Sequence, residues 1–486
     1  MNYKMVFNTI GKVLCAIGAV LLLPTLVALV YGEWMQSIAF STTAVATFLI
    51  GALLTFLIKP KTTALYAKEG FVTVALAWIF ISIAGAFPFV ISGDIPNYVD
   101  AFFETVSGFT TTGASIVADF STLSKASIFW RCFMPWIGGM GILVFVIAIS
   151  NKTTDRSLHI LRSEMPGPII DKFVPKAKTT ALILYAIYFV LTTLMAIFLV
   201  CGGMPFFESL CHALSTAGTG GFGAYADGFV STTPYIQWVT SVFMFLFGIN
   251  FNLYFLIIIG KLANVFKSTE LWAYVGIAIV ATVVIAINVS PIYGDVGTSI
   301  THSVFQVSSI ITTTGFASTD FATWPALSKG IILFLMFTGG CAGSTAGGFK
   351  ISRLIILVKK GLNELKRLLH PHTATVVKFE GKKLDDETLN GVNTYFGIYV
   401  LCFIMVFLLL SIDPAVPQAS AFETNFSSAL SCFNNIGPGF ASTGPMSSYA
   451  LYSPFSKIVL SLSMLLGRLE LYPILLTLNI STWSKK

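Results

Sequence analysis

Four short tracts rich in threonine and glycine carry the residue pattern in this sequence that is best suited to bind an ion. The tracts are Phe109–Ala114, Ser215–Phe222, Ile311–Phe316 and Cys432–Phe440. When one glycine of each tract is aligned, Gly113, Gly221, Gly315 and Gly437 fall in register. Recurrence of one pattern along a chain indicates an internal repeat. The repeat predicts a single site built from four non-identical copies of one unit.

Coordination by backbone carbonyls is the chemistry that such tracts favour. A strand whose carbonyl oxygens point toward one axis can replace the water around a monovalent cation. Glycine tolerates the backbone dihedrals that this orientation requires. One such tract is a weak signal, because threonine and glycine are also common where membrane helices touch. Four tracts predict a selectivity filter, whose candidate ligands are Thr111, Thr112, Gly113, Thr219, Gly220, Gly221, Thr313, Thr314, Gly315, Asn435, Ile436 and Gly437.

The composition favours a membrane protein that is not an enzyme. Hydrophobic residues make up 55% of the chain and charged residues 10%, whereas a soluble domain carries about 25% charged residues. The sequence contains no HExxH or GxSxG motif, no paired intramembrane aspartates and no CxxC pair among its seven cysteines. We therefore expect no catalytic site, no tightly bound cofactor and no nucleic-acid partner. The net charge of +7 is expected to set the orientation in the lipid bilayer.

The elements that must position the four tracts are membrane helices. A span needs roughly 20 apolar residues, and ten segments are long enough. They lie near 7–31, 37–58, 71–92, 127–150, 180–201, 234–260, 271–291, 328–358, 391–411 and 455–482. Four shorter apolar segments, each directly before a glycine tract, are predicted to enter the membrane and turn back. These lie near 98–110, 205–217, 299–312 and 418–433.

The basic residues support this topology. If ten spans alternate and the short segments turn back, 24 of the 29 lysines and arginines fall on one side. Cytoplasmic loops are enriched in these residues, so both termini are expected in the cytoplasm of a multi-pass inner-membrane protein. The basic residues outside this pattern are Lys125, Arg131, Lys329, Lys457 and Arg468.

The predicted fold is an all-α polytopic membrane protein. Four membrane–pore-loop–membrane repeats surround a pseudo-four-fold pore, and two further transmembrane helices precede them. The expected divisions are the two N-terminal helices in residues 1–66 and the four repeats in 67–178, 179–268, 269–385 and 386–486. The third division includes a broken helix and a cytoplasmic loop.

Two features are candidates for a gate. Half of the stretch Gly339–Gly348 is glycine, and each mid-helix glycine costs roughly 1 kcal/mol relative to alanine. The helix is therefore predicted to break here, although close helix packing through small residues is the alternative. Arg468 lies inside the last span, where arginine is costly and usually faces a cavity. A salt bridge to Glu470 is the alternative for Arg468. The candidate gating residues are Gly339, Gly340, Gly343, Ser344, Thr345, Gly347, Gly348 and Arg468.

The chain resembles the Trk/Ktr/HKT superfamily of potassium transporters, and within it the TrkH family, over nearly its whole length. Besides the four tracts, the resemblance rests on Trp136–Gly141, Gly339–Gly348 and Leu466–Glu470. It implies a potassium-selective pore that also passes Rb⁺, a homodimer, and a cytoplasmic nucleotide-binding ring of the TrkA type. The four aligned glycines become filter residues. A serine at the first of them accompanies sodium permeation in related plant transporters, so Gly113 favours potassium.

Two kinds of transport remain open from the sequence. The first is channel-like potassium uptake, gated by the glycine-rich loop and the cytoplasmic partner. The alternative is symport of potassium with Na⁺ or H⁺. Carriers often have inverted repeats and ionisable groups at the membrane midplane, whereas the four repeats here share one orientation. His212 and His302, on the short segments, are expected to be structural. Glu104, Glu208 and Glu423 are either structural or cation-attracting.

Overall fold

Helices make up nearly all of the regular structure in the computed structural model, which describes residues 1–60, 67–141, 177–371 and 376–483. Two N-terminal spans come first: α1 (Tyr3–Val20) with α2 (Leu22–Tyr31), and α3 (Trp34–Leu57). Small residues allow α1 and α3 to pack closely. A Cβ atom built on Gly51 would lie 2.6 Å from the carbonyl oxygen of Gly11, so a larger side chain there would separate the two helices.

Four units follow, each with a long first helix, a short helix and a second helix. The first unit is α4 (Ala67–Ser92), α5 (Tyr98–Phe109) and α6 (Lys125–Gly139). The second is α9 (Ala177–Cys201), α10 (Phe206–Ala217) and α11 (Pro234–Phe247) with α12 (Phe251–Ile258). The third is α14 (Thr269–Tyr293), α15 (Val296–Ile311) and α16 (Ala326–Thr338) with α17 (Ile351–Leu369). The fourth is α18 (Asp386–Leu410), α19 (Ala421–Phe433) and α20 (Pro454–Arg468) with α21 (Tyr472–Leu478).

The remaining elements are short. Within the described residues they are α13 (Leu262–Phe266), α22 (Ile480–Trp483), four 3₁₀ turns and one hairpin of two-residue strands. The turns are η1 (Phe120–Thr122), η3 (Phe321–Thr323), η4 (Ala441–Thr443) and η5 (Tyr449–Leu451). The antiparallel strands are β1 (Lys378–Phe379) and β2 (Lys382–Lys383).

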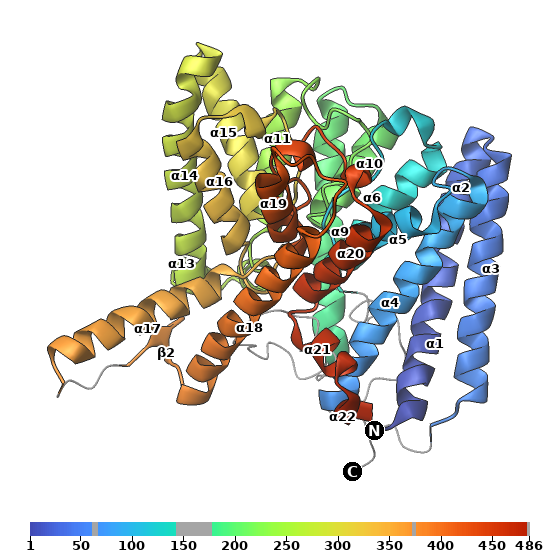
Figure 1. The fold of residues 1–486 in the computed structure, drawn as a ribbon, viewed down its shortest axis with the longest axis horizontal. Coiled ribbons are helices and arrows are strands. Elements are labelled where there is room, and N and C mark those ends of the chain that lie inside the picture. The colour runs from blue at the N-terminus through green and yellow to red at the C-terminus, as the bar shows by residue number, and fades with distance from the viewer. Residues whose placement is uncertain (61–66, 142–176, 372–375, 484–486) are drawn as a thin grey trace.

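The four units close into a ring. The second helix of each unit packs against the short helix of the next: α6 against α10, α11 against α15, α16 against α19, and α20 against α5. In Figure 1 the four short helices lie in the upper half, and both termini lie at the lower edge. Stacking of the Tyr3 and Trp483 rings, with centroids 6.2 Å apart, joins the two ends of the chain. The expected four-fold arrangement and the four short helices are thereby confirmed.

The helices are long and apolar enough for a membrane, but fewer are continuous than the sequence predicted. Six described helices can span by length and composition, and α11 with α12 makes a seventh although the two meet at 90°. The second helices of the units break instead of continuing. The breaks follow Gly139, Phe247, Thr338 and Arg468. Residues 142–150 of the predicted fourth span lie outside the described residues. The sequence predicted only the break after Thr338.

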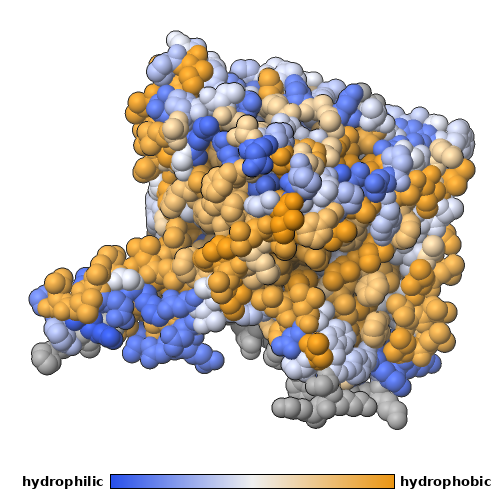
Figure 2. All heavy atoms as spheres, in the orientation of Figure 1, coloured by the Kyte–Doolittle hydropathy of each residue, from blue (hydrophilic) through white to orange (hydrophobic). Residues whose placement is uncertain are grey.

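Apolar side chains cover the part of the surface that lipid would contact. Figure 2 shows a broad hydrophobic area over the middle of one face, with hydrophilic residues gathered along its upper edge and around the projecting α17 at lower left. Large apolar residues are exposed on several spans, for example Phe56 and Leu57 on α3 and Ile287 on α14. Such exposure is unfavourable in water and favourable in lipid.

Candidate functional site

Each short helix ends in the same backbone turn, which directs the following tract toward the middle of the molecule. In the first unit Thr111 has φ +58°, its N–H donates to Gly108 O, and the Thr112 N–H donates to Ser107 O. This pairing is a Schellman motif. The equivalent turns place Thr219, Thr313 and Asn435 at φ +53°, +55° and +56°. Left-handed backbone is uncommon for threonine, so its occurrence at three threonines and at Asn435, each directly after a short helix, identifies equivalent positions.

The four aligned glycines lie in one closed ring. A Cβ atom on Gly113 would lie 2.7 Å from the Gly220 carbonyl oxygen, and one on Gly221 would lie 2.3 Å from Thr314 O. A Cβ on Gly315 would lie 1.9 Å from Ile436 O, and one on Gly437 would lie 2.6 Å from Thr112 O. Each glycine therefore touches the carbonyl preceding the glycine of a neighbouring unit. The ring runs through units one, two, three and four and back to one. All twelve candidate ligands belong to the four tracts that form it.

An open cavity lies on one side of this ring. Its volume is about 210 Å³, and all four glycines line it together with residues from the segments that follow them. Ser115 and Phe120 belong to its wall in the first unit, and Tyr449 in the fourth. The Tyr449 hydroxyl donates to Gly437 O at 2.7 Å. The cavity is thus a mouth that leads to the four tracts.

A side chain nine residues before each glycine holds the segment that follows the tract. Glu104 accepts a hydrogen bond from the Ile116 N–H at 3.0 Å, and His212 Nε2 accepts one from the Ala224 N–H at 3.5 Å. In the other two units Gln306 donates to Thr319 O and Ser428 bonds to Thr443. The structural role expected for His212 fits this position. His302 bonds to Ser318 at 2.9 Å.

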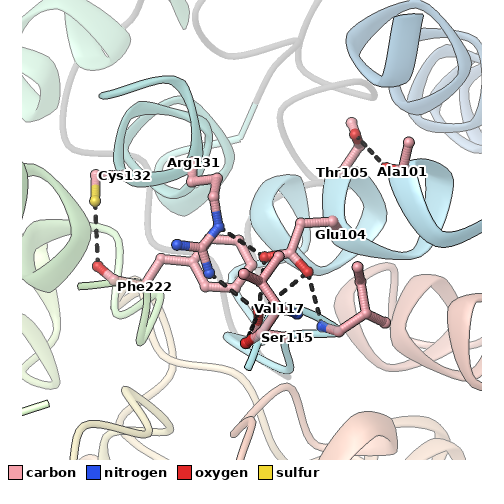
Figure 3. A network of polar contacts seen from close by, with 9 residues as sticks. Ala101, Glu104, Thr105, Ser115, Val117, Arg131, Cys132 and Phe222 are labelled. Atoms are coloured by element: carbon pink, nitrogen blue, oxygen red, sulfur yellow. Dashed lines mark hydrogen bonds and ion pairs between the residues drawn. The ribbon is translucent and has the colours of Figure 1, made fainter. Parts of the chain in front are cut away.

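Among the described residues, Glu104 is the only one of these four side chains that also forms an ion pair. Figure 3 shows Arg131 from α6 reaching Glu104 on α5, with Nε and Oε1 2.7 Å apart and both side chains fully buried. Arg131 Nη2 also donates to Ser115 Oγ at 3.1 Å, and Ser115 Oγ donates to Glu104. No role was expected for Arg131 from the sequence. Its position outside the cytoplasmic pattern of basic residues was the available signal.

The other basic residues outside that pattern join neighbouring units. Lys125 lies 3.1 Å from Glu208, Lys457 lies 2.6 Å from Asp100, and Lys329 lies 3.8 Å from Glu423. Each pair links a second helix to the short helix of the next unit. Between the second and third units, Trp238 donates to Thr301 at 3.1 Å. Partly exposed ion pairs contribute modestly to stability. These three pairs nevertheless give Asp100, Glu208 and Glu423 a structural role as partners of the lysines.

The predicted break in the eighth span is confirmed, and the resulting loop lies directly beneath the ring. Residues 339–350 are not helical, and Gly339, Gly343 and Gly348 have φ of +70°, +73° and +78°. The Gly347 N–H donates to Thr313 Oγ1 at 2.6 Å, and a Cβ on Gly347 would lie 2.6 Å from Asn434 O. The loop therefore contacts the tracts of the third and fourth units.

Bonds inside the loop and to α11–α12 fix its shape. Ser344 donates to Cys341 O at 2.6 Å, and a Cβ on Gly340 would lie 2.6 Å from Ala346 Cβ. Cys341 N–H donates to Gly248 O, and Thr345 Oγ1 donates to Phe247 O. The loop is a folded segment with specific partners, in which close approach requires the small residues.

Arg468 joins this loop to the first unit. Its guanidinium donates to Thr345 O at 2.9 Å and to the carbonyl oxygens of Gly138 and Gly139, both at 2.6 Å. Glu470 instead pairs with Arg353, at 2.6 Å, as expected because residues two apart point to different helix faces. A cationic side chain thus lies beside the loop, below the ring of glycines.

Glu270 holds both ends of the loop from the start of α14. Its Oε1 accepts from the Ala342 N–H at 2.7 Å and from the Ser352 N–H at 3.1 Å. Glu380, beside the β1–β2 hairpin, in turn accepts from the Glu270 N–H at 2.9 Å and from Ser268 Oγ at 3.1 Å. Sequence reasoning missed this chain of contacts, because nothing in the local pattern relates residues so far apart.

The donor set of the site consists of backbone oxygens. Among the described residues, no group of three His, Cys, Asp or Glu side chains is arranged to hold a metal ion. A closed ring of carbonyls suits a large monovalent cation that exchanges water for neutral oxygens. Divalent cations usually require carboxylate ligands. The arrangement therefore favours passage of a monovalent cation.

Comparison with known proteins agrees with this geometry. A family model described as TrkH, cation transport protein, matches residues 36–486. The chain is 34% identical over 491 residues to the Trk system potassium uptake protein TrkH of Salmonella typhimurium, covering 99% of this chain and 100% of the relative. It is 32% identical to the Trk system potassium uptake protein TrkG of Escherichia coli, covering 99% of each. The crystal structure of the potassium transporter TrkH from Vibrio parahaemolyticus is similar with a TM-score of 0.86, at 32% identity and full coverage of both chains.

Proposed function

This chain belongs to the TrkH family of cation transport proteins, and on that premise we propose that it takes up potassium ions through the ring of four tracts. The family resemblance found from the sequence is confirmed, and the chain is a multi-pass membrane transporter, not an enzyme. Potassium is proposed as the substrate because the relatives named above are potassium uptake proteins and because the donor set fits.

The observation that carries the proposal is the closed ring. Four tracts from distant parts of the chain bring Thr112, Gly220, Thr314 and Ile436 carbonyls against the glycines of their neighbours. Short helices that end at the ring direct the negative ends of their dipoles toward it, which favours cations. Backbone of this irregular kind survives in a membrane only where it is buried or lines a watery cavity. A partly dehydrated K⁺ ion would be held by the twelve candidate ligands.

We propose that the loop 339–350 and Arg468 form the gate. The loop lies beneath the tracts, so an ion leaving the ring must pass it. Arg468 adds positive charge, which raises an electrostatic barrier to cations in a low-dielectric setting. The arginine ties the loop to α6, and we propose that this arrangement corresponds to a closed gate.

We also propose the orientation of the chain in the membrane and its protein partners. Both termini are placed in the cytoplasm and the protein in the inner membrane, because most basic residues fall on the side of the termini. A TrkA-type nucleotide-binding ring is proposed to act on that side, and two copies of the chain to form a homodimer. The projecting α17 supports a further contact, because its apolar residues Leu362, Leu365 and Leu369 are exposed beside basic ones.

Rubidium flux into liposomes that contain the purified protein tests the transport mode. Channel-like conduction predicts uptake that follows the membrane potential and persists without any Na⁺ or H⁺ gradient. Uptake that requires a second ion gradient would establish symport instead. A preparation without K⁺ or Rb⁺ flux under either condition would contradict the proposed function.

A further inference from the structure

We propose that Glu104 and Arg131 are positioning residues that set how strongly the filter prefers potassium over sodium. Their buried ion pair fixes the segment after Gly113 and, through Phe222, the segment after Gly221. The inference rests on the proposed function of the ring and assigns a role to a pair that lies outside the twelve candidate ligands.

The pair is connected to the segment that follows the first tract by several bonds at once. Glu104 accepts from Arg131 Nε at 2.7 Å, from the Ile116 N–H at 3.0 Å and from Ser115 Oγ at 3.0 Å. Arg131 Nη2 completes the network by donating to Ser115 Oγ. Ser115 is two residues beyond Gly113 and lines the mouth of the ring. Figure 3 shows that the Glu104 and Arg131 side chains converge on Ser115.

Arg131 also reaches the second unit. Its guanidinium lies between two rings, 4.3 Å from the Phe120 centroid and 4.4 Å from the Phe222 centroid. Phe222 directly follows Gly221, and Cys132 next to the arginine donates to Phe222 O at 3.4 Å. Cation–π contacts of a desolvated guanidinium are favourable. One side chain therefore holds the segments that leave two adjacent quarters of the ring.

The Glu104–Arg131 pair is charged, whereas the side chains at the equivalent positions of the other three units hold their segments through uncharged hydrogen bonds. His212, Gln306 and Ser428 hold the equivalent segments through single hydrogen bonds. Charge-assisted bonds are shorter and roughly twice as strong as neutral ones, and burial strengthens them further. The segments after Gly113 and Gly221 are thus held more firmly than those after Gly315 and Gly437. Because Na⁺ is smaller than K⁺, a ring of carbonyls that resists contraction disfavours Na⁺. Weakening the Glu104–Arg131 network should therefore admit more Na⁺.

The test measures Rb⁺ uptake into liposomes that contain the full chain, with K⁺ or Na⁺ added as a competitor. The readout is the ratio of the inhibition of Rb⁺ uptake by K⁺ to the inhibition by Na⁺. Glu104→Gln, Arg131→Lys and Ser115→Ala each weaken the network. The matched control is Asp100→Asn, one turn earlier on α5. This change removes the ion pair with Lys457 and leaves the Glu104–Arg131–Ser115 network after Gly113 untouched. Each variant is first checked for folding by size exclusion and thermal melting.

The expected result is a fall in K⁺ preference of about threefold or more in the folded network variants, with the wild-type ratio kept in Asp100→Asn. If Glu104→Gln does not fold, because a buried guanidinium has lost its partner, Ser115→Ala decides, since it keeps the ion pair. Wild-type ratios in every folded network variant, or an equal fall in Asp100→Asn, would overturn the inference. Gly113→Ser serves as the reference: if it changes the ratio and the network variants do not, only this inference fails, and if none changes it, the filter assignment fails.

Discussion

The Gly347 amide donates a 2.6 Å hydrogen bond to the Thr313 hydroxyl, so the loop that breaks the eighth span is joined directly to a strand of the glycine ring. Both residues are buried or nearly so. The same loop is held by Arg468 from the fourth unit and by Glu270 from the third. Displacing the loop therefore requires breaking bonds to the ring and to two helices.

Replacing Gly113 by serine should lower the preference for K⁺ over Na⁺. A Cβ at this position meets backbone, 2.7 Å from Gly220 O and 3.0 Å from Gly221 Cα, so a strand must shift. The φ of +79° adds strain of about 1–2 kcal/mol for a residue with a side chain. Competition of Na⁺ with Rb⁺ uptake measures the effect. An unchanged ion preference in folded protein would count against the filter role of Gly113.

Replacing Arg468 by alanine should raise Rb⁺ flux in the absence of any cytoplasmic partner. The change removes a positive charge and the bonds that tie Thr345 to α6. Arg468→Lys should give an intermediate flux, because one ammonium keeps the charge but cannot reproduce the planar fork that reaches three carbonyls. Equal or lower flux in Arg468→Ala than in the wild type would favour a purely structural arginine.

Replacing Glu270 should loosen the loop in a graded way. Glu270→Gln keeps an acceptor oxygen for Ala342 and Ser352 but loses the charge, whereas Glu270→Ala removes both bonds. Charged acceptors bind roughly twice as strongly as neutral ones, so partner-independent flux should rise from wild type to glutamine to alanine. Glu380→Gln, which weakens the contact beyond Glu270, should resemble Glu270→Gln. A flux that does not follow this order would argue that Glu270 only caps the first turn of α17.

Asp413, in the turn after α18, should contribute stability that depends on pH. Burial raises its pKa, but hydrogen bonds from Ser453 and Ser456 and the backbone amides of Ala415 and Ser453 outweigh this and lower it to about 2. Because the pKa is lower in the folded protein, the ionised carboxylate stabilises the fold at pH values above the ordinary aspartate pKa. This contribution is lost as the pH falls toward 2. Asp413→Asn should therefore lower the melting temperature at neutral pH, with a difference that narrows on acidification. A constant difference across that range would contradict the assignment.

The sequence predicted the repeat well because its signals are local. Each short helix is apolar and is followed at once by its glycine tract, so both the helix and the tract could be placed to within a few residues. Alignment on Gly113, Gly221, Gly315 and Gly437 also anticipated which positions meet. The number of continuous spans was overestimated, because hydropathy persists across breaks such as the 90° bend between α11 and α12.

The contacts that support the ring could not be predicted, because they join residues from different elements. Glu104 and Arg131 belong to two helices with the tract between them, and no periodicity relates them. Lys125, Lys329 and Lys457 stood out only as basic residues away from the cytoplasmic loops. Their acidic partners lie in the next unit, so pairing them requires knowledge of how the ring closes. A lysine near the start of the second helix in the first, third and fourth units was the available signal.

Anomalous scattering from Rb⁺, measured on crystals of the protein grown or soaked in rubidium salt, tests most directly whether the four tracts form one ion site. We expect density on the axis of the ring, within coordination distance of carbonyls from all four units, including Thr112, Gly220, Thr314 and Ile436. Density that is bound elsewhere, or a ring that stays empty while Rb⁺ flux is measurable, would contradict the account.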